Sequence, residues 1–244
     1  MLRFSIITLF PEAVKPYLET SMLRKATERK LVQIKLVNPR DFTTDPSTPL
    51  RAGKRRQADD RPYGGGPGMV LKAEPLLRAV ASLKLPTSLK LRGTSKIIIT
   101  SPRGKQFTNE LAAKWAKKYK EIVIIAGHYE GIDARVKKIL SARGGSAFGG
   151  KVEEISVGPY TLTGGEVPAL VMVDAVTRRL PGVLGKSESL EERRIAPEET
   201  YTRPEVLVFP FDKAHGKQKK YKVPPVLLSG HAANIAKWRQ AKVC

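Results

Sequence analysis

Residues 96–127 read "KIIITSPRGKQFTNELAAKWAKKYKEIVIIAG", and this stretch decides the fold class of the chain. It begins with the apolar run "KIIIT" and ends with a second run, "EIVIIAG", a pattern typical of strands buried inside a parallel sheet. Between them Phe107, Leu111 and Trp115 recur every fourth residue, which predicts a helix over residues 106–119. Strands alternating with helices indicate an α/β domain with a mainly parallel sheet.

The same alternation extends to both sides of this stretch. Residues 3–10 predict a buried strand, residues 13–30 have a helical spacing of apolar residues, and residues 32–42 predict a second strand. Residues 154–163 predict a further strand, which Gly158 and Pro159 interrupt. Two more apolar helical faces consist of Leu76, Leu77, Val80 and Leu83, and of Leu170, Val173, Val176 and Leu180.

The chain divides into two parts by composition. Residues 186–200 contain little apolar material and are predicted to form an exposed linker. We therefore expect one domain over residues 1–185 and a small C-terminal domain over residues 201–244. The second part has too few apolar residues for a core of its own, so we expect it to pack on the first domain or on a second subunit.

The charge of the chain favours a nucleic-acid partner. Its net charge is +21 and its pI is near 10.2, an imbalance that costs self-repulsion unless an anionic partner relieves it. The basic residues cluster at 51–57, 114–120, 193–194 and 213–222. One such cluster can be a solubilising face, but four together favour contact with a phosphate backbone.

Other classes of protein are disfavoured by the composition. The only cysteine is Cys244, which excludes an internal disulfide framework and a zinc site built on paired cysteines. No apolar run approaches eighteen residues, and the N-terminal stretch lacks the features of a secretory signal. We therefore expect a cytoplasmic protein that does not span a membrane. The three histidines have no metal-binding spacing, so no metal site is predicted.

Glycine-rich segments follow the predicted strands. Residues 59–72, "DDRPYGGGPGMVLK", read as a shaped loop, because glycine permits positive φ and proline stiffens turns. Three further loops, 100–105, 126–133 and 157–166, each follow an interior strand. Because ligands bind at the carboxyl ends of strands in open α/β sheets, we expect these three loops to converge on one site.

Two familiar nucleotide-binding loops are disfavoured. Residues 145–152, "GSAFGGKV", fit G-x-x-x-x-G-K, but Val152 replaces the Ser or Thr that would hold magnesium. No G-x-G-x-x-G follows a predicted strand, so a dinucleotide site of the Rossmann type has no support.

At these loops the sequence resembles a known family. The motifs "DDRPYGGGPGM", "GHYEGID", "YTLTGGEVPA", "DAVTRRLPGVLG", "YTRPEV" and "VPPVLLSGH", then "WR", resemble the bacterial tRNA (guanine-N1)-methyltransferases of the TrmD family, in the SPOUT superfamily. The resemblance runs from Met1 to about Arg239. It implies a trefoil-knotted S-adenosylmethionine (AdoMet) site in the α/β domain, with a small helical C-terminal domain. It also implies methyl transfer to N1 of the guanine 3′ of the anticodon in tRNA, by a homodimer.

The resemblance implies roles for particular residues. Those expected to bind AdoMet are Ser101, Pro102, Gly127, Tyr129, Val157, Gly158, Pro159, Tyr160, Thr161, Leu162, Gly164 and Gly165. Tyr129 and the loop from Asp59 to Gly68 are expected near the target guanine, with Asp60, Gly66, Pro67 and Gly68 as binding residues. Pro159 is a departure, since the family generally has aspartate there.

The chemistry requires three functions. Guanine N1 carries a proton, so the site needs a general base, a cation or donor opposite O6, and alignment of N1 with the methyl group. By resemblance, Arg178 faces the developing charge, although it can also be read as a cation that stabilises a helix C-terminus. Glu130 is expected beside the donor, in an electrostatic or magnesium-linked role.

The general base is the main departure from the family pattern. TrmD proteins usually have an aspartate in the linker, and counting from Arg178 without gaps places Arg193 in that slot. An arginine cannot accept the proton. Glu191 and Glu192 precede it, and we predict Glu192 as the base. Two alternatives remain: a SPOUT methyltransferase with another target nucleotide, and a basic RNA-binding protein with impaired catalysis, which Arg193 favours.

Overall fold

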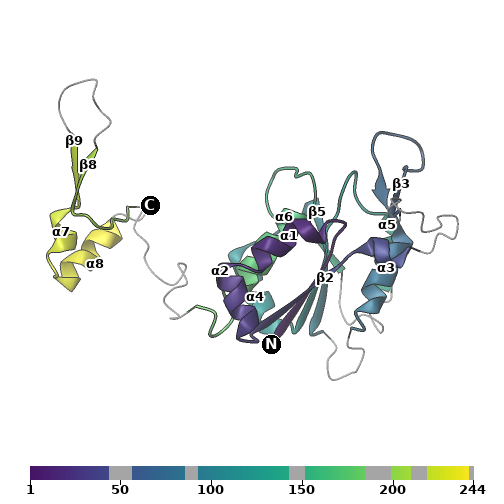
Figure 1. The fold of residues 1–244 in the computed structure, drawn as a ribbon, viewed down its shortest axis with the longest axis horizontal. Coiled ribbons are helices and arrows are strands. Elements are labelled where there is room, and N and C mark those ends of the chain that lie inside the picture. Colours follow the sequence, from purple (N-terminus) through teal and green to yellow (C-terminus); the bar gives the residue numbers. More distant parts are fainter. Residues whose placement is uncertain (44–56, 86–92, 143–151, 185–198, 210–218, 242–244) are drawn as a thin grey trace. The chain divides into compact units, whose positions relative to one another are not determined.

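The computed structural model describes residues 1–43, 57–85, 93–142, 152–184, 199–209 and 219–241 (Figure 1). The chain forms two compact units, Met1–Gly185 and Lys186–Cys244. The first unit contains the predicted sheet and all the glycine-rich loops.

A five-stranded parallel sheet forms the centre of the first unit. Its order is β2-β1-β6-β5-β7, and every pairing between neighbours is parallel. The strands are β1 (Leu2–Ile7), β2 (Val32–Val37), β5 (Ser95–Gln106), β6 (Glu121–Ile125) and β7 (Val152–Ser156). The two apolar runs that decide the fold class are neighbours, with Ile98 opposite Ile124. The prediction of an α/β fold with a mainly parallel sheet is confirmed.

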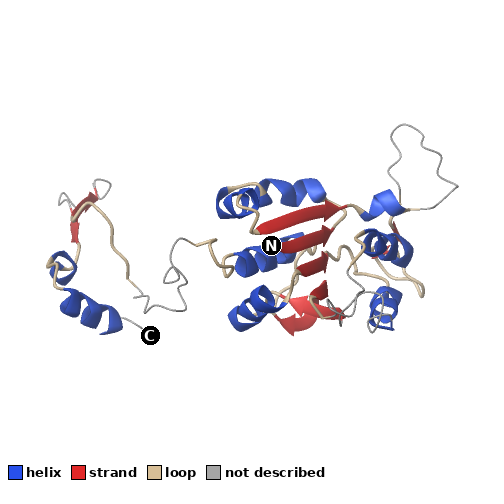
Figure 2. Ribbon diagram, turned by 90° about the horizontal axis from the view of Figure 1, so that it is seen from below, coloured by secondary structure: helices blue, strands red, loops and turns tan. Residues whose placement is uncertain are grey.

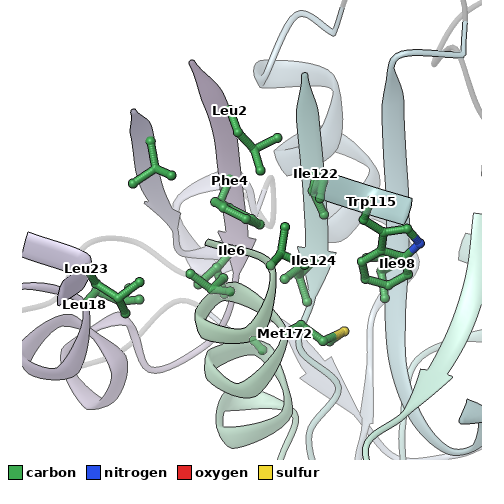
Figure 3. Close-up of a cluster of buried hydrophobic side chains, with 14 of the residues drawn as sticks. Leu2, Phe4, Ile6, Leu18, Leu23, Ile98, Trp115, Ile122, Ile124 and Met172 are labelled. Carbon is green, nitrogen blue, oxygen red and sulfur yellow. The ribbon is translucent and has the colours of Figure 1, made fainter. Parts of the chain in front are cut away.

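Helices cover both faces of this sheet (Figure 2). On one face lie α1 (Pro11–Leu18), α2 (Ser21–Glu28), α4 (Asn109–Lys118) and α6 (Glu166–Thr177). On the other lie α3 (Ala73–Ser82), α5 (Ala134–Ala142) and the 3₁₀ helix η1 (Pro39–Phe42). Figure 3 shows the core on the first face, where Trp115 and Met172 pack against Phe4, Ile98 and Ile124. Burying each large apolar side chain stabilises the fold by roughly 1.5–3 kcal/mol.

Two predicted strands are shorter than expected, and each ends at a local polar contact. The strand predicted over residues 32–42 ends at Val37, because the Asn38 side chain accepts a hydrogen bond from the Arg40 N–H (3.0 Å) and caps η1. The strand predicted over residues 154–163 ends at Ser156. There the Ser156 hydroxyl donates to the Gly158 carbonyl (2.8 Å), which closes a turn in place of the sheet ladder.

The helical pattern over residues 13–30 forms two helices. α1 ends at Leu18 and α2 begins at Ser21, because Thr20 is extended and Ser21 has φ +46°. Both helices still bury their apolar faces against the same side of the sheet. The spacing therefore predicted the buried face correctly and missed the break.

The second unit pairs β8 (Val206–Phe209) with β9 (Lys219–Lys222) as an antiparallel hairpin, followed by α7 (Pro225–Leu228) and α8 (Ala232–Ala241). Among residues 199–208 and 220–241 of this unit, no side chain is buried. Among the helices of the described ranges, none combines the length and apolar character that crossing a bilayer needs.

Candidate functional site: converging loops at the sheet edge

The three predicted loops meet where β5, β6 and the start of α6 come together. The Thr100 hydroxyl accepts a hydrogen bond from the Gly127 N–H (2.9 Å). The Gly165 N–H in turn donates to the Gly127 carbonyl (2.6 Å), and His128 forms an antiparallel bridge with Gly164. Segments that lie far apart in the sequence thus share one edge of the sheet, as expected for a ligand site in this fold class.

The contacts at this edge are possible only because several residues lack side chains. A Cβ at Gly165 would overlap the Thr100 hydroxyl and stand 2.6 Å from the Gly127 nitrogen. A Cβ at Gly104 would stand 2.5 Å from the Ile155 nitrogen. The region around Thr100, Gly127 and Gly165, here called the cradle, is therefore built from closely packed main chain.

The first of the three loops is an excursion within a strand. Thr100 and Lys105 both align with Ile155 of β7, so residues 101–104 bulge out of β5. Ser101 and Pro102 lie on this bulge, where the Ser101 hydroxyl accepts a hydrogen bond from the Arg103 N–H (3.3 Å). The third loop carries Tyr160 and Leu162 with 55% and 41% of their surface exposed. Two large apolar side chains at a polar edge are available to cover a ligand.

The glycine run is tied to the second loop through the main chain. It lies between β3 (Asp59–Asp60) and β4 (Val70–Leu71), which pair with each other. The Glu130 N–H donates to the Met69 carbonyl (3.0 Å), and a Cβ at Gly68 would stand 2.6 Å from the Glu130 carboxylate. The structure thus brings Gly68 and Glu130 together.

The middle of the glycine run is open. Gly64, Gly65 and Gly66 all have positive φ, and among the described residues, chain neighbours apart, no atom lies within 4 Å of a Cβ built on any of them. These glycines are needed for the backbone conformation, whereas those of the cradle are needed for contact between chain segments. The open side leaves room for a flat ligand beside the main chain.

Tyr129 connects the glycine run with the cradle. Its backbone has φ +56°, and its ring meets the His128 ring edge to face at 4.4 Å. Burial, and then the hydrogen bond and negative charge of Asp59, raise the pKa of Tyr129. A residue held at positive φ beside a glycine loop is characteristic of functional sites.

Asp60 is engaged by its own neighbours. Its carboxylate accepts a hydrogen bond from the Arg61 N–H (2.9 Å) and pairs with Lys72 (3.2 Å). These two contacts hold the pKa of Asp60 below its usual range. Asp60 therefore stays ionised at neutral pH and anchors the start of the glycine run.

Arg178 is not brought to the cradle. It follows the last residue of α6, whereas Gly165 precedes the first, and the twelve residues of α6 separate them. At 1.5 Å per residue this helix spans roughly 18 Å. Glu192 and Arg193 lie outside the described residues, as do residues 145–151 of the G-x-x-x-x-G-K match. In the described ranges, three or more His, Cys, Asp or Glu residues nowhere gather as a metal site.

Sequence reasoning missed Thr100, whose hydroxyl links the first two loops. A signal was available, since Thr100 is the polar residue that ends an apolar run. A hydroxyl there can hydrogen-bond main-chain groups of the neighbouring strand.

Comparison with known proteins gives a consistent result. The family described as "tRNA (Guanine-1)-methyltransferase TrmD" matches residues 2–244. Relatives named "tRNA (guanine-N(1)-)-methyltransferase" include one from Dictyoglomus turgidum, 42% identical over 98% of this chain and 84% of its own length. Others come from Trichodesmium erythraeum (40% identical, 98% and 91%) and Desulforamulus reducens (40% identical, 98% and 83%).

Proposed function

The chain belongs to the tRNA (guanine-1)-methyltransferase TrmD family, and from this premise we propose that it transfers a methyl group from AdoMet to N1 of the guanine 3′ of the anticodon in tRNA. The proposal is carried by one observation: the loops that hold the family-like motifs converge at the cradle of Thr100, Gly127 and Gly165. The net charge of +21 suits a tRNA substrate.

The cradle fits AdoMet by its chemistry. Main-chain N–H and C=O groups of the loops around it are suited to the edge of an adenine ring, and Tyr160 and Leu162 offer apolar surface. When bound, AdoMet supplies a methyl group already activated by the sulfonium charge. We assign donor binding to the twelve residues named in the sequence analysis and place these loops in a trefoil knot. The knot is carried over from the family, and the close approach of Gly165 to Thr100 and Gly127 is compatible with it.

The open glycine run is assigned to the target base. Gly66, Pro67 and Gly68 lie on the loop that is tied to Glu130, with Asp60 anchoring its start. If a guanine lies beside these glycines, Tyr129 stands between it and the cradle. Glu130 lies at this boundary, where a carboxylate acts on charge near the donor, directly or through Mg²⁺.

A homodimer is supported by α6. This helix is apolar except for Glu166, Asp174 and Thr177, and its Val167 and Val171, one turn apart, have 56% and 42% of their surface exposed. Apolar helices of this kind are normally covered. A second copy with the same face, related by a two-fold axis, would cover it. Because Arg178 lies at the far end of α6, we assign it to the site of the partner subunit.

Replacing Val171 with glutamate is expected to convert the dimer into a monomer and to abolish methyl transfer, because a charge would be buried at the centre of the covered face. Sedimentation at micromolar concentration measures the mass. Ala81→Glu, at an exposed position of α3 on the opposite layer, should leave the dimer intact. A dimeric Val171→Glu variant would contradict the assignment of this face.

Replacing Glu192 with glutamine is expected to lower kcat by about a hundredfold, since general-base catalysis typically contributes at least this factor. The Kd for AdoMet should not change. Glu191→Gln, one residue away in the same stretch, is the matched control and should retain activity. If the glutamine at 192 leaves single-turnover methyl transfer unchanged, Glu192 is not the base.

Primer extension on tRNA incubated with the protein and AdoMet tests the whole proposal. A stop at the guanine 3′ of the anticodon is the expected result, and a stop at another nucleotide would indicate a different target. Binding of tRNA without incorporation of labelled methyl groups would favour the RNA-binding alternative, which the arginine at position 193 supports.

A further inference from the structure

A chain of polar contacts runs behind the cradle through Thr8, Glu166 and His128. Thr8 follows β1, His128 follows β6, and Glu166 is the first residue of α6. The Thr8 hydroxyl donates to one Glu166 carboxylate oxygen (2.7 Å) and accepts a hydrogen bond from the Phe10 N–H (3.0 Å). Glu166 is therefore held firmly at its Thr8 end, and its negative charge is favoured by the helix N-terminus.

The contact at the other end is incomplete. His128 Nδ1 lies 3.7 Å from the second Glu166 carboxylate oxygen, too far for a hydrogen bond. This nitrogen is buried and has no hydrogen-bond partner among the described residues. The Phe10 ring, with its centroid 4.8 Å from that of His128, and the Tyr129 ring hold the imidazole in place. A buried polar atom without a partner costs free energy, which a small movement would recover.

The third loop lies between these two side chains. A Cβ at Gly164 would overlap the Glu166 carboxylate and stand 2.6 Å from His128 Nδ1. The main chain of Gly164 also pairs with that of His128. The two loops are already paired through their main chains, so a shift of the His128 and Glu166 side chains would close the distance between them, and about half an ångström suffices for a hydrogen bond.

We propose that His128 and Glu166 are positioning residues that form this hydrogen bond when the donor binds. The bond couples the third loop to the second, so the donor-bound cradle fixes Tyr129 and Glu130, which directly follow His128 in the chain. This inference rests on the proposed function, because it takes AdoMet as the ligand of the cradle. Neither side chain is assigned to contact the donor or the guanine.

Variants of His128 test the inference. His128→Leu removes the imidazole N–H that would donate the hydrogen bond to Glu166. This variant should raise the Kd for AdoMet about tenfold, while the KM for tRNA stays constant. His128→Asn places an amide nitrogen near the position of Nδ1 and should restore affinity to within about threefold. His128→Gln, whose amide lies near the position of Nε2, should not. Thr8→Val, which removes the hydroxyl that holds Glu166, should also weaken AdoMet binding. Its matched control is Thr27→Val, which removes a hydroxyl that donates to the Leu23 carbonyl within α2.

A double-mutant cycle between His128→Leu and Glu166→Gln separates positioning from a purely structural role. Because we propose that the bond forms only when AdoMet is bound, the two losses in Tm should add in protein without AdoMet. With saturating AdoMet, the loss in Tm of the double variant should be smaller than the sum of the two single losses. The double variant should also bind AdoMet no worse than His128→Leu. Coupling of equal size without AdoMet, or an unchanged Kd in His128→Leu, would overturn the inference.

The outcomes of these experiments distinguish a failure of the positioning role from a failure of the proposed methyltransferase function. If the unmodified protein binds AdoMet and methylates tRNA while the variants bind equally well, only the positioning role is lost. If the unmodified protein does not bind AdoMet by calorimetry, the donor assignment and this inference fall together. If His128→Leu fails to fold, the positioning role can still be tested with Thr8→Val, His128→Asn and His128→Gln. Thr8→Val should weaken AdoMet binding, as His128→Leu would.

Discussion

Replacing Gly165 with alanine is expected to lower the affinity for AdoMet by about 10²- to 10³-fold. The new methyl group would overlap the Thr100 hydroxyl and stand 2.6 Å from the Gly127 nitrogen and 2.8 Å from the Ala126 Cα. The last two are backbone atoms, which cannot rotate away. Overpacking costs about 1–3 kcal/mol and the lost Gly165–Gly127 hydrogen bond about 0.5–1.5 kcal/mol. The cradle of the variant relaxes to relieve this strain, so AdoMet must restore the original geometry when it binds, and each 1.4 kcal/mol that this takes is tenfold in affinity.

Isothermal titration calorimetry with AdoMet measures this effect. Gly93→Ala is the matched control, because Gly93 has φ +77° and, chain neighbours apart, no atom of a described residue lies within 4 Å of an added Cβ. Alanine there strains the backbone by about 1–2 kcal/mol and should lower Tm without changing the Kd. A Gly165→Ala protein that binds AdoMet within threefold of the unmodified protein would show that the donor binds elsewhere.

Replacing Arg178 with alanine is expected to lower kcat by about 10²- to 10³-fold, the range seen when one group that stabilises developing charge is removed. The Kd for AdoMet should stay the same, because Arg178 is assigned to the charge that develops on the guanine and not to the methyl donor. Lysine should restore activity only in part, since it cannot reproduce the planar donor geometry of arginine. Single-turnover kinetics with saturating tRNA measure the change.

Mixing the two inactive variants tests whether Arg178 acts across subunits. In a mixed dimer, the Arg178→Ala subunit keeps an intact cradle and receives Arg178 from its Gly165→Ala partner. One site per mixed dimer is then complete, and random mixing of two-fold dimers should restore about a quarter of the unmodified activity. If Arg178 acts within its own chain, no site is complete and the mixture stays inactive.

The sequence predicted those features that depend on local pattern. Continuous apolar runs predicted β5 and β6 as interior strands, and the spacing of Phe107, Leu111 and Trp115 predicted α4 between them. Strands in parallel order bring their carboxyl ends together, so the meeting of the three loops also followed from the order of elements. α5 was not predicted, because its buried face consists of only Val136 and Leu140.

Tertiary structure alone decided which residues of the site act together. Glycines look alike in the sequence, but Gly165 is needed for contact with Thr100 and Gly127, whereas Gly64 to Gly66 are needed for positive φ beside open space. The bond between Thr8 and Glu166 joins residues 158 positions apart, and the far end of α6 carries Arg178 away from its own cradle. The sequence by itself determined the elements and their order, because apolar periodicity and turn residues act over a few positions. The contacts between distant segments were decided only when the packed sheet brought the ends of its strands to one edge.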